Sequence, residues 1–220
     1  LRLHGTSDHR LDELLVNGYR DYLQCARDIP PGNDRQVLDR WALEVLQAHG
    51  CFQLLCALRA GETGVENLNR RCEDSLQQAG LVDARREWYA GRPVIVMRND
   101  YSLGLMNGDI GIVVPHPAGL RVAFPAGDGS VRWILPARLA DVETVFAMTV
   151  HKAQGSEFGH AVLLLPEQAS PVLTRELLYT AITRAAERFT LADHSDESLS
   201  VCIARRVQRV SGMLVHDRLY

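Results

Sequence analysis

The sequence has no excess of basic residues, because its 24 Lys and Arg are matched by 27 Asp and Glu for a formal net charge of −3. Composition alone therefore gives no indication of a nucleic-acid-binding protein. The sequence also lacks any apolar run near the roughly 18 residues that a membrane-spanning helix needs, so we predict no membrane association. Residues 1–6 contain neither an initiator methionine nor a signal-peptide pattern, and we expect a piece excised from a longer protein.

The cysteines form no C-x-x-C pair, and their number, five, is odd. This usage predicts reduced and mostly buried thiols in a cytoplasmic protein rather than a disulfide framework. His49, Cys51 and Cys56 are the nearest approach to a set of metal ligands. The run between the two cysteines is apolar and typical of a strand, so we predict no metal site.

Hydrophobic residues make up 46% of the 220 residues, enough for a sizeable core in one large or two small domains. Apolar residues at helical spacing predict two helices before residue 50, which either pack on the rest of the chain or act as an adaptor. Residues 52–58 are almost continuously apolar, as expected for a parallel strand covered on both faces. Residues 92–141 contain four short runs rich in β-branched residues, separated by turn sequences such as Asn107-Gly108. They predict a small antiparallel barrel inserted in an α/β domain.

A strand is predicted to lead into residues 149–158, because Phe146, Met148 and Val150 alternate with their neighbours at a period of two. Residues 149–158 then begin at the carboxyl end of that strand, where ligands collect in open parallel sheets. Gly155 lacks a Cβ, so its backbone can approach an oxyanion closely or adopt a positive φ.

Donors surround that glycine: His151, Lys152 and Gln154 each offer at least one N–H. Glu157, when ionised, only accepts, which suits a ribose hydroxyl or a cation better than a phosphate. The mixture suggests that a nucleotide and a nucleic-acid backbone share one loop. His151 taken alone can equally be a packed, hydrogen-bonded histidine.

A second stretch, residues 178–185, lies on a predicted helix. The apolar arc of this helix consists of Leu177, Leu178, Ala181, Ile182 and Ala185. Arg184 falls beside that arc, one turn after Thr180. Its planar guanidinium suits phosphate oxygens, so it is a candidate arginine finger, although an arginine beside an apolar stripe is usually a solvated flank.

These two stretches resemble motifs V and VI of superfamily 1 DNA helicases. Residues 52–61, 64–69, 91–94 and 107–111 extend the likeness to the RecD (alpha) subunits of exodeoxyribonuclease V, from about Trp41 onward. The resemblance implies the second, RecA-like motor lobe: a parallel sheet with flanking helices and an inserted SH3-like β-barrel. We accordingly expect a helical segment over 1–50, motor domain 2A over 51–91 and 142–220, and the barrel, domain 2B, over 92–141.

The resemblance also implies residue roles. Arg184 would contact the γ-phosphate of ATP in the transition state, Glu157 the ribose and Gly155 the phosphates, with Gln154 beside them. Thr149, His151 and Lys152 would bind the DNA backbone. Arg59 is a weaker candidate for a phosphate contact, in uncertain register. Arg98 and Tyr101, in a barrel loop, offer charge and a stacking face to single-stranded DNA, although Tyr101 can also simply pack that loop.

The phosphate-binding Gly-x-x-x-x-Gly-Lys-Ser/Thr loop and the acidic pair that holds Mg²⁺ are both missing from these 220 residues. We therefore expect ATP with Mg²⁺ to be bound mainly by an absent N-terminal lobe, and this piece to be inactive alone. The resemblance implies a bacterial 5′→3′ helicase that acts on single-stranded DNA at a duplex end, together with the other two exodeoxyribonuclease V subunits. The alternatives are a subunit-docking or DNA-binding module with vestigial motor residues, and a stand-alone RecD-like helicase.

Overall fold

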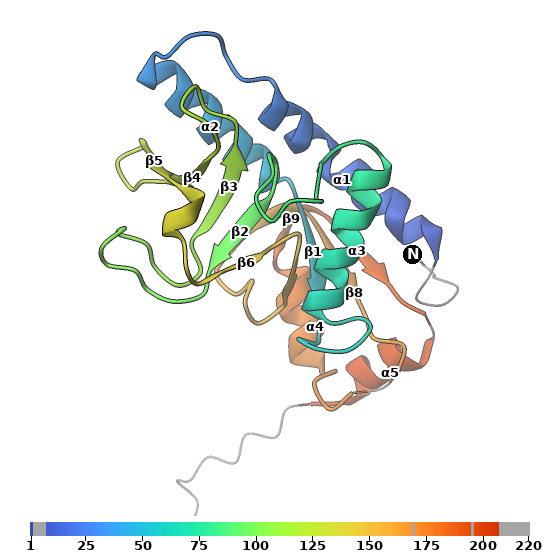
Figure 1. The fold of residues 1–220 in the computed structure, drawn as a ribbon. Helices are drawn as coiled ribbons and strands as arrows, with labels where there is room; N and C mark the ends of the chain where they lie inside the picture. Colours follow the sequence, from blue (N-terminus) through green and yellow to red (C-terminus); the bar gives the residue numbers. More distant parts are fainter. Residues whose placement is uncertain (2–7, 169, 195, 207–220) are drawn as a thin grey trace, which may run out of the picture.

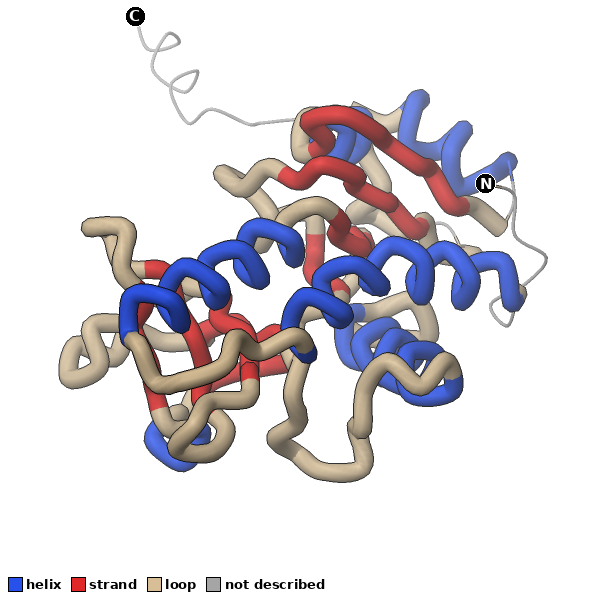
Figure 2. The backbone as a smooth tube through the Cα atoms, turned by 90° about the horizontal axis from the view of Figure 1, so that it is seen from above, coloured by secondary structure: helices blue, strands red, loops and turns tan. Residues whose placement is uncertain are grey.

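The computed structural model describes residues 1, 8–168, 170–194 and 196–206, which form two β-sheets with helices packed around them (Figure 1). The parallel sheet has the strand order β7-β1-β8-β9, and the antiparallel sheet has the order β5-β4-β3-β2-β6. Two helices lead into the sheets; Figure 2 shows α2 over the antiparallel sheet and α1 beside the parallel one. No helix within the described ranges is long and apolar enough to cross a membrane.

The parallel sheet is covered by helices on both faces, as its apolar strands predict. Leu54 and Cys56 of β1 face a core shared with α1 and α3, whereas Leu55 faces a second core shared with α4 and α5. The two faces alternate because successive strand side chains point in opposite directions. The elements are β1 (Phe52–Cys56), β7 (Ala147–Thr149), β8 (Phe158–Leu164), β9 (Ala185–Ala192), α1 (His9–Arg27), α2 (Arg35–His49), α3 (Val65–Gln78), α4 (Arg175–Ile182) and α5 (Asp196–Ala204).

The antiparallel sheet follows the four predicted runs, with one addition. Its strands are β2 (Pro93–Val96), β3 (Ile110–Val114), β4 (Arg121–Pro125), β5 (Val131–Ile134) and β6 (Val142–Thr144), and a short helix, η1 (Pro136–Arg138), precedes β6. Residues 142–144, expected to return to the parallel sheet, instead pair antiparallel with β2. The second sheet therefore extends three residues beyond its expected end at residue 141.

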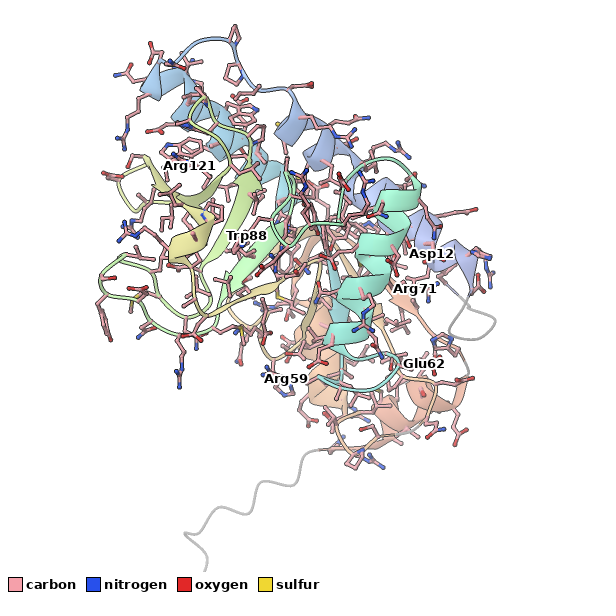
Figure 3. All side chains as sticks on the ribbon, in the orientation of Figure 1. Asp12, Arg59, Glu62, Arg71, Trp88 and Arg121 are labelled. Atoms are coloured by element: carbon pink, nitrogen blue, oxygen red, sulfur yellow. The ribbon has the colours of Figure 1, made fainter. Side chains whose placement is uncertain are left out.

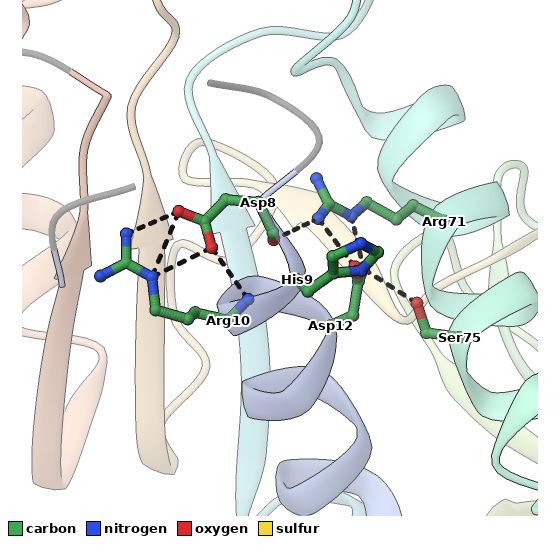
Figure 4. A network of polar contacts seen from close by, with 6 residues as sticks. All are labelled: Asp8, His9, Arg10, Asp12, Arg71 and Ser75. Carbon is green, nitrogen blue, oxygen red and sulfur yellow. Dashed lines mark hydrogen bonds and ion pairs between the residues drawn. The ribbon is translucent and has the colours of Figure 1, made fainter. Parts of the chain in front are cut away.

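A half-buried ionic cluster joins α1 to α3 (Figure 4). The Asp12 carboxylate accepts hydrogen bonds from Arg71 Nε at 2.6 Å and from Ser75 Oγ at 3.0 Å. Arg71 Nη2 also donates to the carbonyl of Asp8 at 2.8 Å. Because the Arg71 side chain is only 20% exposed and is held by α1, its place is in the fold rather than on a solvated face.

Asn69 of α3 caps the outer edge of β7. Its Oδ1 accepts from the Ala147 N–H at 2.9 Å, and its Nδ2 donates to the Ala147 carbonyl at 3.0 Å. The Asn69 side chain thereby satisfies the N–H and C=O groups of Ala147, which is buried in an outer strand of the parallel sheet, just before residues 149–158.

We expect Asn69→Leu to lower the free energy of unfolding by about 1–3 kcal/mol, because leucine leaves the buried N–H and C=O of Ala147 without partners. Urea denaturation measures the loss. Gln77→Leu, at an exposed position of the same helix, is the control and should change stability by no more than about 0.5 kcal/mol. Equal stability of the two variants would contradict the edge-capping role.

The cysteines are free thiols, and Cys56, Cys72 and Cys202 are buried as predicted. Cys51 is exposed, because it lies in the turn between α2 and β1 rather than in the strand. Burial raises the pKa of Cys56 to about 12, so this thiol stays protonated near neutral pH.

The sequence also predicts a last helix with Leu199, Ile203, Val207 and Val210 on one face, and this helix lies partly outside the described residues. Leu199 packs against the second core, but Ile203 is half exposed. The remaining residues of that face, Val207 and Val210, are not among those described, and neither is Arg209, which is expected to lie away from it.

Candidate functional site

The loop after β7, residues 149–158 and here called the motif loop, runs from the carboxyl ends of the parallel strands to their amino ends. We call these two ends the carboxyl edge and the amino edge of the sheet. Thr149 pairs with Cys56, the last residue of β1, so the motif begins at the carboxyl edge as expected. It ends at the opposite edge, because His160 pairs with Phe52, the first residue of β1, and Phe158 lies two residues earlier. The candidate residues therefore form two groups rather than one cluster.

Arg184 belongs to the group at the amino edge, where its guanidinium reaches the motif loop. Nη1 donates to the Ser156 carbonyl at 2.7 Å, and Nε donates to the Thr180 carbonyl at 3.2 Å. Nη2 donates to Thr183 Oγ1 at 3.3 Å. The half-buried guanidinium is thus fixed beside the residue that separates Gly155 from Glu157.

The predicted helix around Arg184 is shorter in the structure than the apolar stripe indicated. Helix α4 ends at Ile182, Thr183 is its C-cap, and Ala185 already begins β9. Ala185 pairs with Phe158, and the Phe158 N–H donates to the Arg184 carbonyl at 2.8 Å. Sheet pairing has overridden local helical periodicity here, and it holds the Arg184 backbone against the end of the motif loop.

Gly155 adopts the positive φ that its sequence position allows, at +92°. An added Cβ would meet no described atom within 4 Å, so the backbone faces open space and a side chain would be resisted by conformation rather than by contact. Gln154 and Glu157 are exposed on either side. The Cβ side of Gly155 is therefore open, next in sequence to the Ser156 carbonyl that binds Arg184.

The second group lies at the carboxyl edge, around a small cavity of about 60 Å³ between the two sheets, here called the inter-sheet pocket. Arg59, which follows β1, and Lys152 stand at this pocket with Thr149. The Thr149 Oγ1 accepts from the Lys152 N–H at 3.2 Å, which fixes the turn that carries the lysine. The lining residues are Arg59, Val65, Ile95, Met97, Glu143, Thr144, Val145, Ala147, Met148, Thr149 and Lys152.

Both cations of the pocket reach across to the antiparallel sheet. Lys152 Nζ donates to Asn107 Oδ1 at 3.3 Å and lies 3.2 Å from Met97 Sδ. Arg59 Nη2 pairs with Glu143 Oε1 at 3.1 Å, and both of these side chains are well exposed. The sequence analysis did not identify Glu143 as a site residue, because β6 was not expected to join the antiparallel sheet. It also did not identify the contact between Asn107 and Lys152.

His151 and Tyr101 are exposed, so neither is the packed side chain that its alternative interpretation required. The Tyr101 side chain has 79% of its surface exposed and is contacted at its hydroxyl by Asn99 Nδ2, at 3.2 Å. Lys152 is the only lysine in the 220 residues. Its ammonium group is therefore chemically distinguishable from the guanidinium and imidazole groups of the other basic side chains.

The comparisons with known proteins agree with these motifs. A family model described as the UvrD-like helicase C-terminal domain matches residues 144–192. The RecBCD enzyme subunit RecD of Mycobacterium tuberculosis is 44% identical over 172 residues, 78% of this chain and 29% of that protein. RecD of Haemophilus influenzae is 34% identical over 95% of this chain and 32% of its own length. The ATP-dependent RecD2 DNA helicase of Deinococcus radiodurans is 34% identical over 87% of this chain and 26% of its own length.

The similar solved structures include the Pif1 helicase from Bacteroides in complex with ADP-AlF3 and ssDNA, at 16% identity. It covers 88% of this chain and 51% of that chain, with a TM-score of 0.43. The chain spans less than a third of the length of the three curated relatives named above. By its sequence matches, the chain belongs to the RecD family of superfamily 1 DNA helicases and represents a C-terminal portion of it.

Proposed function

We propose that this chain is the C-terminal motor lobe of an ATP-dependent 5′→3′ DNA helicase and translocase, a subunit of the exodeoxyribonuclease V complex in the repair of double-strand breaks. The observation that carries the proposal is the hydrogen bond from Arg184 to the Ser156 carbonyl. It joins the two motifs, 28 residues apart, at one exposed rim. The protein would act in the bacterial cytoplasm on single-stranded DNA at a duplex end, beside two other subunits.

The proposed domain division assigns residues 51–91 and 142–220 to motor domain 2A, with residues 1–50 packed on it and an SH3-like barrel over 92–141. The parallel sheet with its two helical layers supports the first part. The antiparallel sheet supports the inserted unit, which we extend to Thr144 because β6 pairs with β2. Loop residues Arg98 and Tyr101 would add charge and a stacking face to the DNA contact.

ATP with Mg²⁺ would be held mainly by residues outside this chain and, when bound, supplies the free energy for translocation. The residues at the amino edge fit a nucleotide. Gly155 leaves room for phosphate oxygens, Arg184 offers a cationic fork, and the exposed Glu157 carboxylate can accept from a ribose hydroxyl, with Gln154 adjacent. Arg184 would stabilise charge on the γ-phosphate. Because the phosphates must first be held elsewhere, we expect negligible ATPase activity from this chain alone.

Thr149, His151 and Lys152 would bind the backbone of single-stranded DNA at the carboxyl edge. Arg59, expected from the resemblance to contact a nucleotide phosphate, lies at the same pocket as Lys152, and we assign it to the DNA instead. The hydroxyl and imidazole groups donate hydrogen bonds to phosphates, and the two cations attract them. The Glu143 carboxylate now paired with Arg59 would be replaced by phosphate when DNA binds. A loop that holds DNA at one edge and nucleotide at the other would couple the two sites through a single turn.

The DNA assignment predicts that single-stranded DNA protects Lys152 from acylation by an amine-reactive ester. Mass spectrometry should show at least about tenfold slower labelling at Lys152, because a phosphate bound to the ammonium blocks its reaction with the ester. The α-amino group is the internal control and should react unchanged. Lys152→Ala should also reduce the salt slope of binding by about 1.

Thr149→Ala and His151→Ala should weaken affinity for single strands more than affinity for nucleotide. Equal labelling of Lys152 with and without a DNA strand that is demonstrably bound would remove this residue from the DNA contact. A filter-binding titration that shows no loss for either alanine variant would remove Thr149 and His151 as well.

The competing functions differ in their partners. A docking module with vestigial motor residues would lose nothing on Arg184→Ala in the intact protein, whereas a motor would lose its hydrolysis. A stand-alone RecD-like helicase would purify without two further subunits. Co-purification of the intact protein from its own cells, followed by the Arg184 variant, separates the three.

A further inference from the structure

A second cavity, of about 460 Å³, lies between the amino end of α2 and the turn that joins β3 to β4; we name it the α2–β4 pocket. It lies at the end of β3 away from the loop that carries Arg98 and Tyr101. Figure 3 shows its residue Arg121 beside α2, well separated from Arg59 of the inter-sheet pocket. The lining residues are Asn33, Arg35, Leu38, His116, Pro117, Ala118, Arg121 and Trp133.

Two aromatic rings in this pocket are held in place by their own hydrogen bonds. Trp133 Nε1 donates to Asp39 Oδ1 at 2.6 Å, so the indole edge is already satisfied. His116 Nδ1 accepts from the Ala118 N–H at 3.1 Å, and the two ring centroids lie 5.1 Å apart. Burial and the Arg121 charge lower the pKa of His116, which favours the neutral ring. Fixed rings lose little conformational entropy when a planar group stacks on them.

Two guanidinium groups complete the pocket. Arg35, in the first turn of α2, has a 76% exposed side chain, and its Nε lies 3.7 Å from Asp39 Oδ2. Arg121 is half-buried, and its Nη1 donates to the Leu120 carbonyl at 2.8 Å. Asp39 contacts both Trp133 and Arg35, so this carboxylate offsets part of the charge of Arg35. The pocket is left with a net attraction for an anion.

The chemistry that matches these walls is a planar aromatic group attached to a phosphate. We propose that the α2–β4 pocket holds one nucleotide of a single strand of nucleic acid, with its base on Trp133 and its phosphate on Arg35 and Arg121. The volume falls within the roughly 300–1,000 Å³ of small-ligand sites. Stacking and charge together give sequence-independent binding. The choice of single-stranded nucleic acid as the ligand rests on the proposed function, whereas the pocket and its chemistry do not depend on that function.

A peptide anchor fits the walls less well. The lining surface is mostly apolar and also suits an apolar side chain, but the guanidinium groups of Arg35 and Arg121 favour a ligand with an anionic edge. The walls include rings, guanidinium groups and exposed turn residues, which suit a flat ligand with a charged edge.

The test is photo-cross-linking of the full chain to a 5-iododeoxyuridine-substituted oligothymidylate, mapped by mass spectrometry. We expect cross-links at Trp133 or His116. Arg35→Glu and Arg121→Glu should each weaken binding of a 20-nucleotide strand by about tenfold. Arg70→Glu, an exposed arginine on α3 away from the pocket, is the matched control and should bind as wild type. Arg35→Glu is informative even if the Arg121 variant does not fold, because an acidic residue is favourable in the first turn of a helix.

The outcomes separate this proposal from the proposed function. Binding that depends on Lys152 but gives no cross-link in the pocket overturns the pocket alone. Cross-links at Trp133 that persist with unchanged affinity in Lys152→Ala support the pocket and overturn the inter-sheet DNA contact. No binding by the wild-type chain overturns both. Displacement of the Trp133 cross-link by an acidic aromatic peptide, with no effect of Arg35→Glu on DNA affinity, assigns the pocket to a protein partner and overturns the nucleotide.

Discussion

We expect that replacing Arg184 with alanine in the intact protein lowers the proposed DNA-stimulated ATP hydrolysis by about 10³- to 10⁵-fold, the range an arginine finger supplies. The structure gives the physical reason. The guanidinium donates to two carbonyl oxygens and one hydroxyl, all of them neutral. A γ-phosphate is a stronger partner for a cation than any of these acceptors. Steady-state hydrolysis with and without single-stranded DNA measures the effect.

The same variant also loses hydrogen bonds that position the motif loop, so its control must separate folding from catalysis. Arg188→Ala removes an exposed arginine four residues further along the chain, in β9, and should leave both melting temperature and turnover unchanged. Arg184→Lys keeps the charge but not the fork, and should recover little of the rate. Near-normal turnover of Arg184→Ala with a native melting temperature would refute the arginine finger.

Local patterns in the sequence predicted most of the secondary structure. The continuous apolar run of β1 indicated a strand covered on both faces, and helical stripes indicated α1 and α2. Gly155 was singled out for a positive φ, and it has one. These predictions succeed because each depends on side-chain spacing along a single element.

The geometry of the site depends on contacts that spacing does not encode. Lys152 and Asn107 are 45 residues apart, and Arg59 and Glu143 are 84 apart. The end of α4 before Arg184 follows from pairing of Ala185 with Phe158, and local periodicity favoured a longer helix. The α2–β4 pocket is likewise built from three separate segments. Sequence reasoning could therefore name candidate residues without dividing them between the two edges of the sheet.

Protonation of a buried histidine at acidic pH is expected to have the second large effect, which is on stability rather than on activity. His49, at the end of α2, is 3% exposed and packs between Tyr19, stacked with ring centroids 6.3 Å apart, and Tyr22, edge-on at 5.1 Å. Burial lowers its pKa from 6.5 to about 4, so the folded state holds the ring neutral. Between these values the unfolded chain binds more protons than the folded one. The contribution is fully present above pH 6.5 and is lost as the pH falls toward 4.

We expect wild-type protein to lose about 2–3 kcal/mol more stability between pH 7 and pH 4.5 than His49→Phe, since one pKa unit corresponds to about 1.4 kcal/mol. Urea denaturation at the two pH values gives each difference, and comparing the differences cancels the other titrating groups that both proteins share. His151→Ala removes an exposed imidazole and should keep the wild-type pH dependence. If His49→Phe loses as much stability as wild type, the acid sensitivity arises from other groups. The His49 imidazole would then not contribute to the acid sensitivity, and it would have to carry a charge while buried between the two tyrosines.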